Sequence, residues 1–549
     1  MSRFNDGKPD YLKRLKQSFK DGNPLIPALN DYVETSVRPE IYNIQLTKGD
    51  ISCIGEPKHL APCILDPCFS ALGLDELFAS IKHSSKIQYD LQGIVRLLTY
   101  ERLLKPDSKI AAMGRNNSYV TPLVKSKNDV LDVIFQNRSK IFKRINSNIS
   151  KNIGRNVSNV YYDVTNFFFE RDLPDDDITD EDGNSIEKGL RKMGVSKENR
   201  KQPIVQMGLF LDDNGIPISI EMFPGNTLDH LTLRTAMKNT VNDLDLNRFI
   251  LVSGRGVYSG TNICHVINNG NGYIVSKSIK KSTGSDRQWI VEQDGYTEES
   301  PDFKYKSKIA EVTVTDEDGK KKKIKQKVVV YWNRKFYERE RRENRNFIEF
   351  IDKLRSNPNG FRVTAAQSRS IRKYIRKEML NKNTGEIVDS QELLSMIDDE
   401  KLNEFKELMG YYQIVSSELD TSAKEIIEKY HGLTRIEDQF REMKSTLEAR
   451  PIYVRTSEHI KAHLIVCFIS LTMLRVLQLK TQKSIPANAD KDTYWFYGMS
   501  GNKLTNILYD WKADMFSGDY YRMIHSDVDE LKKFLSAFEV ELEYKLYSI

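Results

Sequence analysis

A β-branched and aromatic segment, Val160-Tyr-Tyr-Asp-Val-Thr-Asn-Phe-Phe-Phe169, follows a long region of helical character. Residues of these types favour strands, and an apolar run of this density indicates a strand within a sheet. The two-residue period of a strand places Tyr161, Asp163 and Thr165 on one face. A carboxylate among apolar neighbours is costly to bury unless it is paired or binds a metal ion. Asp163 is therefore either an edge-strand residue that faces solvent or a member of a functional site.

The segments that follow this strand predict an α/β fold. The runs Ile204–Leu211 and Ile216–Phe223 flank a turn, Asp212-Asp-Asn-Gly215, and together predict a β-meander. A helical stretch near Leu231–Asn242 and a short buried strand, Phe249–Val252, come next. This order of strands first, then a helix, a strand and another helix is the one that an RNase-H-like core would give.

This core is predicted to be interrupted. Ile309–Thr315 and Ile324–Trp332 predict a long hairpin, and an arginine-rich helix is predicted from Tyr337 to about Leu354. Because a long loop without structure of its own is unusual in a compact domain, we expect a β-rich insertion subdomain. The expected divisions are a helical N-terminal DNA-binding or dimerisation region (1–150), an RNase-H-like core in two parts (151–281 and 416–484), the insertion subdomain (282–415) and a helical C-terminal region (485–549).

Composition excludes several classes of protein. Of the 549 residues, 39% are hydrophobic and 29% are charged, which is typical of a globular chain rather than a disordered one. Five cysteines without metal-site spacing favour a reducing cytoplasm over a disulfide framework. The apolar run His463–Leu479 contains Arg475 and is short for a membrane span, so it predicts a buried core helix and no membrane partner.

A second notable carboxylate lies in a helix predicted from Ser422 to about Leu447. Apolar residues at helical spacing mark the face that packs inward: Ile436, Phe440, Met443 and Leu447. Glu437, Arg441, Lys444 and Glu448 form a polar stripe beside it. Taken alone, this stripe is either a solvated face with ion pairs or part of a functional site.

A resemblance favours the functional interpretation of both acids. Tyr162-Asp-Val-Thr-Asn-Phe-Phe-Phe-Glu170, Gly194-Val-Ser-Lys-Glu-Asn-Arg200 with Gln202-Pro-Ile-Val-Gln-Met-Gly208, and Phe223-Pro-Gly-Asn-Thr227 occur in that order. They are followed by Tyr430-His-Gly-Leu-Thr-Arg-Ile-Glu-Asp-Gln-Phe-Arg-Glu-Met-Lys444 and Arg450-Pro-Ile-Tyr-Val454. This series resembles the DDE transposases of prokaryotic insertion sequences, in particular the long members of the insertion-sequence-four superfamily that carry an inserted β domain. The resemblance extends from about Glu101 to about Leu474.

The resemblance implies roles for particular residues. Asp163 and Glu437 correspond to the first and last catalytic acids and would bind Mg²⁺ or Mn²⁺, two ions per intact site. The DNA-binding residues that it implies are Tyr430, Arg435, Arg441, Lys444 and Arg255. Trp332 would either stack on a flipped base or pack in the core. The implied partners are double-stranded DNA, as terminal inverted repeats and target, and a second copy of the chain on paired ends, in the cytoplasm or nucleoid of a prokaryote.

Position 254 departs from the family pattern. The strand Phe249–Val252 runs into Ser253-Gly-Arg-Gly256, where the family has its second catalytic aspartate before Arg-Gly. Gly254 offers no side-chain ligand, and Asp243 and Asp245 lie at the wrong end of the strand. Since a metal ion contributes several kcal/mol to such a reaction, we expect strand cleavage to be slower by on the order of a thousandfold or more.

Other functions stay open at this stage. The basic run Lys320–Lys327 and the arginines near Arg339 either contact DNA phosphates or form a solvated charged hairpin. A chain that retains the fold without the chemistry would be a sequence-specific DNA-binding protein that never nicks its sites. A nuclease of the same fold would cut DNA without joining it.

Overall fold

The computed structural model describes residues 10–20, 52–124, 129–170, 173–180, 182, 185–197, 201–244, 246–357, 397–483, 499–517, 520–525, 527–540 and 546–548. The chain divides into two compact units. One contains Met1–Ile54 with Phe516–Gly518, and it includes helix α1 (Tyr11–Lys20). The other contains Gly55–Met515 and Asp519–Ile549, and everything described below lies in it apart from Phe516.

A mixed sheet forms the centre of this unit. Within the described residues it has nine strands in the order β6-β5-β2-β7-β8-β12-β11-β10-β9. Strands β2, β7 and β8 are parallel to one another, and the remaining neighbours are antiparallel. The bounds are β2 (Asn159–Phe168), β5 (Ile204–Leu211), β6 (Pro217–Pro224), β7 (Ile250–Ser253), β8 (Gly272–Lys277), β9 (Thr297–Ser300), β10 (Phe303–Thr315), β11 (Lys321–Asn333) and β12 (Tyr411–Ser416).

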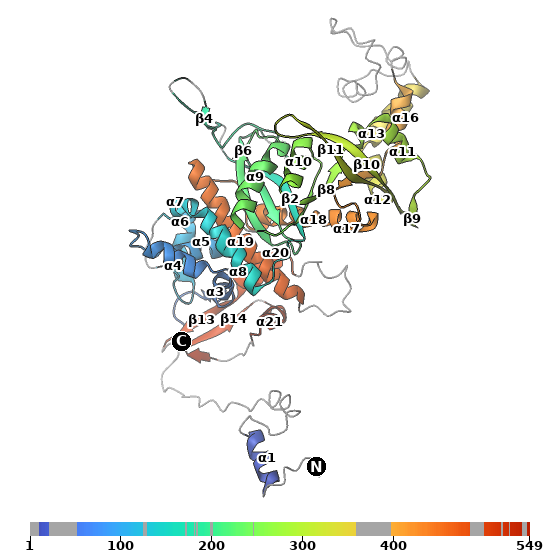
Figure 1. The fold of residues 1–549 in the computed structure, drawn as a ribbon. Helices are drawn as coiled ribbons and strands as arrows, with labels where there is room; N and C mark the ends of the chain where they lie inside the picture. Colours follow the sequence, from blue (N-terminus) through green and yellow to red (C-terminus); the bar gives the residue numbers. More distant parts are fainter. Residues whose placement is uncertain are drawn as a thin grey trace. The chain divides into compact units, whose positions relative to one another are not determined.

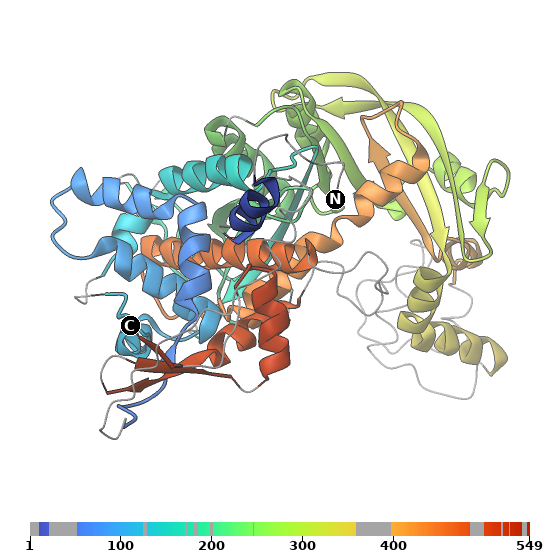
Figure 2. The same ribbon diagram turned by 90° about the horizontal axis from the view of Figure 1, so that it is seen from below.

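Helices cover both faces of the sheet, and the residues of its central strands β2 and β5 are accordingly almost all buried (Figures 1 and 2). One face packs with α9 (Asp229–Leu244) and α10 (Gly260–Asn268), and the core there includes Tyr162, Leu251 and Tyr273. The other face packs with α17 (Ala423–His431), α18 (Thr434–Arg441) and α19 (Ser457–Lys483).

The N-terminal helices gather around α19 (Figure 2). They are α3 (Pro62–Ala71), α4 (Leu74–His83), α5 (Leu91–Leu104), α6 (Lys109–Gly114), α7 (Leu131–Gln136) and α8 (Arg138–Asn152). Helix α19 is long and apolar enough to span a membrane, but 94% of its most apolar window is buried inside the protein. The prediction of a buried core helix at His463–Leu479 is therefore confirmed.

The strands predicted in the insertion join the central sheet. Strand β12 pairs with β8, and β11 pairs with β12, so the sheet continues without a break from the core into residues 297–333. Helices α11 (Gly284–Val291), α12 (Arg334–Glu343), α13 (Arg345–Ser356) and α16 (Asp399–Glu407) lie in the same stretch of sequence. The helix predicted from Tyr337 to Leu354 is divided at Asn344 into α12 and α13.

The prediction of a helical C-terminal region is wrong in part. It contains α20 (Gly501–Asp510) and α21 (Val528–Ser536), but also β13 (Lys512–Phe516), β14 (Tyr520–Ile524) and β15 (Leu546–Ser548). These strands form a small sheet with β1 (Lys58–His59), in the order β1-β13-β14-β15. The boundary predicted at 485, and the predicted residues Arg200 and Asp245, lie outside the described residues.

Candidate active site

The site begins at Asp163, in the middle of β2. It is the one residue of β2 that is not fully buried. The parallel pairing of β2 with β7 runs from Asn159 opposite Ile250 to Tyr162 opposite Ser253. The next residues along the two strands are Asp163 and Gly254. Because Tyr161 lies opposite Val252 and both belong to the core on one face, Asp163 and Gly254 share that same face.

Glu437 comes from helix α18, which packs on this face of the sheet. Asp163, Gly254 and Glu437 all line one pocket of about 890 Å³, together with Arg255 and Tyr430. The pocket continues between β8, α11, α12 and α16, where it has a mixed aromatic and charged lining that includes Ile279, Arg287, Glu340, Phe405, Tyr411 and Tyr412. The structure thus brings together the three positions that the sequence predicts to be catalytic.

The two acids influence each other's charge. Burial raises the pKa of Asp163, and the ammonium of Lys197 opposes that shift. Burial also raises the pKa of Glu437, and the negative charge of Asp163 raises it further. The pKa of Tyr430 is raised mainly by burial and also by both acids. The pocket therefore holds two carboxylates that repel each other and would gain from a shared cation.

Gly254 stands beside open space. A Cβ added at this position would meet no atom closer than the Cδ2 of Leu433, at 4.0 Å. Its backbone is also not in the left-handed region that excludes other residues. Among the described residues, no three histidine, cysteine, aspartate or glutamate side chains are grouped so that they could hold a metal ion. The pocket has two acids and, at 254, the room for a third.

The residues predicted to bind DNA are placed differently from one another. Arg255 and Tyr430 line the pocket. Lys444 lies in the π-helix Glu442–Thr446 after α18, with its ammonium 6.0 Å from the ring of Phe167 and close enough to Asp163 to lower the pKa of that acid. Arg441 is exposed and pairs with Asp438. It is not among the residues that line the pocket.

Arg435 and Trp332 also lie outside the pocket lining. Arg435 pairs with Asp213 and Tyr161 inside the protein. The indole N–H of Trp332 donates to the carbonyl oxygen of Met409 at 3.2 Å, and its ring is 6.0 Å from that of Tyr337. The sequence predicts that Trp332 either stacks on a flipped base or packs in the core, and these contacts favour packing.

Lys197 is a site residue that the sequence interpretation did not single out. Its ammonium donates to the carbonyl oxygen of Val164, the residue after Asp163. Its charge lowers the pKa of both Asp163 and Glu437. From sequence, Gly194–Arg200 is only a family motif, because the position of Lys197 beside both acids depends on tertiary structure.

The lysines of the β10–β11 hairpin have partners close by. Lys323 pairs with Glu311 at 3.1 Å, and Lys322 pairs with Asp316 at 3.5 Å. The ammonium of Lys327 donates to the carbonyl oxygens of Leu419 and Thr421. The ammonium of Lys327 is thus held by the protein itself, whereas Lys322 and Lys323 form ion pairs on the surface of the hairpin, with side chains 45% and 73% exposed.

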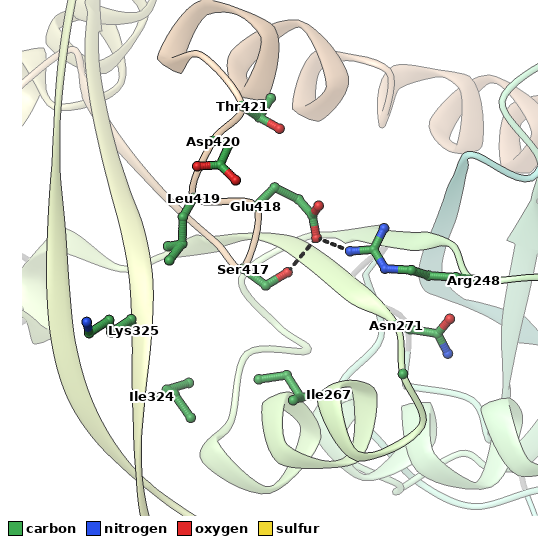
Figure 3. Close-up of a pocket in the computed structure, with 11 residues that line it drawn as sticks. Arg248, Ile267, Asn271, Ile324, Lys325, Ser417, Glu418, Leu419, Asp420 and Thr421 are labelled. Carbon is green, nitrogen blue, oxygen red and sulfur yellow. Dashed lines mark hydrogen bonds and ion pairs between the residues drawn. The ribbon is translucent and has the colours of Figure 1, made fainter.

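A second pocket, of about 590 Å³, lies around Arg248 and Glu418 (Figure 3). The Glu418 carboxylate accepts hydrogen bonds from Arg248 at 2.7 Å and from the Ser417 hydroxyl at 2.9 Å. Of the residues that the sequence analysis considered for DNA contact, Lys325 lines this pocket, and the predicted catalytic residues do not. Because its partly buried carboxylate, Glu418, is already paired with Arg248, the pocket is a weaker candidate for chemistry than the one at Asp163.

Comparison with known proteins identifies a family. A family model described as a transposase DDE domain matches residues 174–473, which is more than half of the chain. Gly254 and Glu437 lie inside this range, and Asp163 lies before it. No curated protein sequence matches the chain.

Two solved structures show weak similarity. One is a piggyBac transposase synaptic complex with hairpin DNA, at 9% identity and a TM-score of 0.37, covering 83% of this chain and 82% of that one. The other is the Mos1 mariner paired end complex with Mn, at 14% identity and a TM-score of 0.12, covering 47% of this chain and 66% of that one. Both TM-scores are low, and neither similarity carries an argument about this chain.

Proposed function

Because the chain belongs to the transposase DDE domain family, we propose that it is a DNA transposase built on an RNase-H-like core and impaired in catalysis by Gly254. Its substrate is double-stranded DNA at the ends of an insertion sequence, which an intact enzyme would cleave and join to a target. The observation that carries the proposal is the meeting of Asp163, Gly254 and Glu437 in one pocket. The strand order β6-β5-β2-β7-β8, with β5 antiparallel to its neighbours, supports the assignment of the core.

The donor set of the pocket fits one hard divalent cation. Mg²⁺ and Mn²⁺ prefer oxygen ligands, and carboxylates supply both charge and position. Asp163 and Glu437 would hold the ion. When bound, it would activate the attacking water or 3′-hydroxyl and stabilise the leaving oxygen. A second ion needs a further carboxylate, and Gly254 does not supply one.

The remaining polar residues would act on the DNA backbone. Lys197, Arg255 and Lys444 carry positive charge near the two acids, and the hydroxyl of Tyr430 lies in the same pocket. Such groups position phosphates without reading sequence. We propose that they hold the scissile strand against Asp163 and Glu437, and that two copies of the chain act on paired ends in a prokaryotic cytoplasm.

The test compares the chain with Gly254→Asp and Gly254→Asn on DNA that carries the element's own ends, with Mg²⁺ or Mn²⁺. A Cβ at Gly254 meets no atom closer than 4.0 Å, and aspartate and asparagine are nearly equal in size, so the pair isolates the effect of the added charge. We expect Gly254→Asp to cleave faster than the chain by on the order of a thousandfold. Gly254→Asn should remain close to the unmodified chain. Equal cleavage by the chain and both variants would contradict the account of position 254.

A second candidate function is favoured by Gly254 itself. A chain that retains the fold and the basic residues around the pocket, but lacks one catalytic acid, can bind DNA without cutting it. It would then be a sequence-specific DNA-binding protein derived from a transposase. Binding to the element's ends by all three proteins, with cleavage by none of them, would select this function.

A further inference from the structure

Arg435 takes part in a network inside the protein. Its Nη1 donates to the hydroxyl oxygen of Tyr161 at 2.7 Å and to Oδ1 of Asp213 at 3.2 Å. The Tyr161 hydroxyl in turn donates to the same carboxylate oxygen at 3.0 Å. Asn159 donates to the other oxygen, Oδ2, at 3.1 Å. The guanidinium also lies 5.3 Å from the centre of the Tyr161 ring. We call Arg435, Tyr161 and Asp213 the Arg435 network.

The network links the elements that carry the two acids. Tyr161 lies two residues before Asp163 on the same face of β2, and Arg435 lies two residues before Glu437 on α18. Asp213 comes from the turn after β5, the antiparallel neighbour of β2. Any movement of α18 along β2 would therefore break hydrogen bonds of the network as well as change the separation of Asp163 and Glu437.

The side chain of Arg435 projects away from the pocket in which the proposed function places the DNA. Successive residues of an α-helix are turned by about 100°, so side chains two residues apart project from nearly opposite sides. Glu437 lines the pocket, and Arg435 does not. The side chains of Arg435 and Asp213 are each 22% exposed, so most of this ion pair is shielded from solvent. Arg435 thus holds the helix from the side away from the pocket.

Gly432 allows the start of α18 to lie close to Tyr161 of β2. A Cβ at Gly432 would overlap the Tyr161 hydroxyl and lie 2.5 Å from Nη1 of Arg435. Gly432 also marks the break between α17 and α18, where the sequence predicts one continuous helix. The break brings the start of α18 against β2 and leaves no room for a larger residue.

We propose that Arg435, with Tyr161 and Asp213, is a positioning residue that sets the separation of Asp163 and Glu437 and thereby the affinity of the site for a divalent cation. This inference rests on the proposed function, which makes the two acids metal ligands. It gives Arg435 a role different from the DNA contact that the family resemblance implies.

The experiment measures two quantities for Tyr161→Phe, Arg435→Ala and the unmodified chain. One is Mn²⁺ affinity, followed by electron paramagnetic resonance, and the other is the salt dependence of binding to a short DNA duplex. We expect both variants to bind Mn²⁺ about tenfold or more weakly, as for other residues that orient metal ligands. Their salt dependence should be unchanged. A phosphate contact would instead lower the salt slope by about one and leave Mn²⁺ affinity unaltered.

Two controls make the outcomes distinct. Lys444→Ala, at a proposed phosphate contact, should lower the salt slope. Asp163→Asn should abolish specific Mn²⁺ binding. If Asp163→Asn binds Mn²⁺ like the unmodified chain, the proposed metal site itself fails. If Asp163→Asn loses Mn²⁺ while Tyr161→Phe and Arg435→Ala retain it, the metal site stands and the positioning role is overturned.

A double variant tests whether the residues act as a unit. The losses in Mn²⁺ affinity should be non-additive, so that Tyr161→Phe has little further effect in the Arg435→Ala chain. Additive losses would mean that the two residues act separately and would overturn the network. Tyr161→Phe removes only a hydroxyl and retains the ring, so it remains informative if Arg435→Ala fails to fold.

Discussion

The charge state of Asp163, a single residue of the pocket, affects the stability of the folded chain and can therefore be measured without DNA. Asp163 has a raised pKa in the folded chain, chiefly because of burial. An acid of this kind is neutral in both states below its unfolded pKa, about 3.9 for aspartate. As the pH rises above that value, the unfolded state loses its proton first, so the folded state becomes relatively less stable. Asp163 therefore costs stability at neutral pH, and the cost disappears in acid.

Asp163→Asn should accordingly raise the thermal midpoint at neutral pH in the absence of divalent cations. The difference should vanish as the pH falls below about 3.9, the ordinary pKa of aspartate. Added Mn²⁺ should stabilise the unmodified chain and have little effect on the variant. Calorimetry over this pH range measures both effects. A lower midpoint for Asp163→Asn at neutral pH would contradict the direction of the pKa shift.

At the scale of elements, the turn between β5 and β6 depends on a buried ion pair. The side chains of Arg155 and Asp212 are 2% and 0% exposed, and they lie 3.3 Å apart. Asp212 Oδ1 also accepts the backbone N–H groups of Asn214 at 2.9 Å and Ile216 at 2.8 Å. The carboxylate thus shapes the turn that leads into Asp213 of the Arg435 network.

Asp212→Ala should lower the free energy of unfolding by about 3–5 kcal/mol, because it leaves the guanidinium of Arg155 buried without its counter-charge. Asp302→Ala is the matched control, since its partner Arg334 and Asp302 itself are 56% and 62% exposed. Its cost should be about 1 kcal/mol or less. Urea unfolding of both variants gives the comparison. Similar losses in the two would show that burial of the pair does not decide its contribution.

Elements with a strong local pattern could be predicted from sequence. The segments expected at Val160–Phe169 and Ile204–Leu211 are β2 and β5 to within one residue. The break between α17 and α18 could not be predicted, because the apolar pattern continues at helical spacing past Gly432. The glycine is required there by the Tyr161 hydroxyl, which comes from a distant strand. The positions of Asp163, Gly254 and Glu437 in one pocket were implied by resemblance. The partners of Arg435 required the tertiary structure.

At the scale of the whole molecule, the central sheet extends across the two boundaries predicted between core and insertion, at 281–282 and 415–416. The edge of β8 is covered by β12, whose residues Gln413–Ser416 are buried. The division into an RNase-H-like core and an insertion subdomain at 282–415 stays a prediction. In the structure these parts share one sheet and one core on each face.

Replacing residues 282–416 with a short linker should therefore prevent folding of what remains. The deletion removes β12 and exposes β8 as an unpaired edge with apolar faces, which favours aggregation. Size-exclusion chromatography and urea unfolding of the deleted chain measure the result. A monodisperse chain with a cooperative transition would show that the core folds independently of the inserted strands.

The open space at Gly254 has an evolutionary consequence. Two of the four glycine codons become aspartate codons by a single nucleotide change, and the nearest atom to a new Cβ is a leucine methyl at 4.0 Å. No neighbouring side chain has grown into the position, and the acids on either side are retained. Under the proposed function, a gene that uses either of these two codons could regain the aspartate by one point mutation, and a silent copy of the element could then be remobilised without any compensating change elsewhere in the protein.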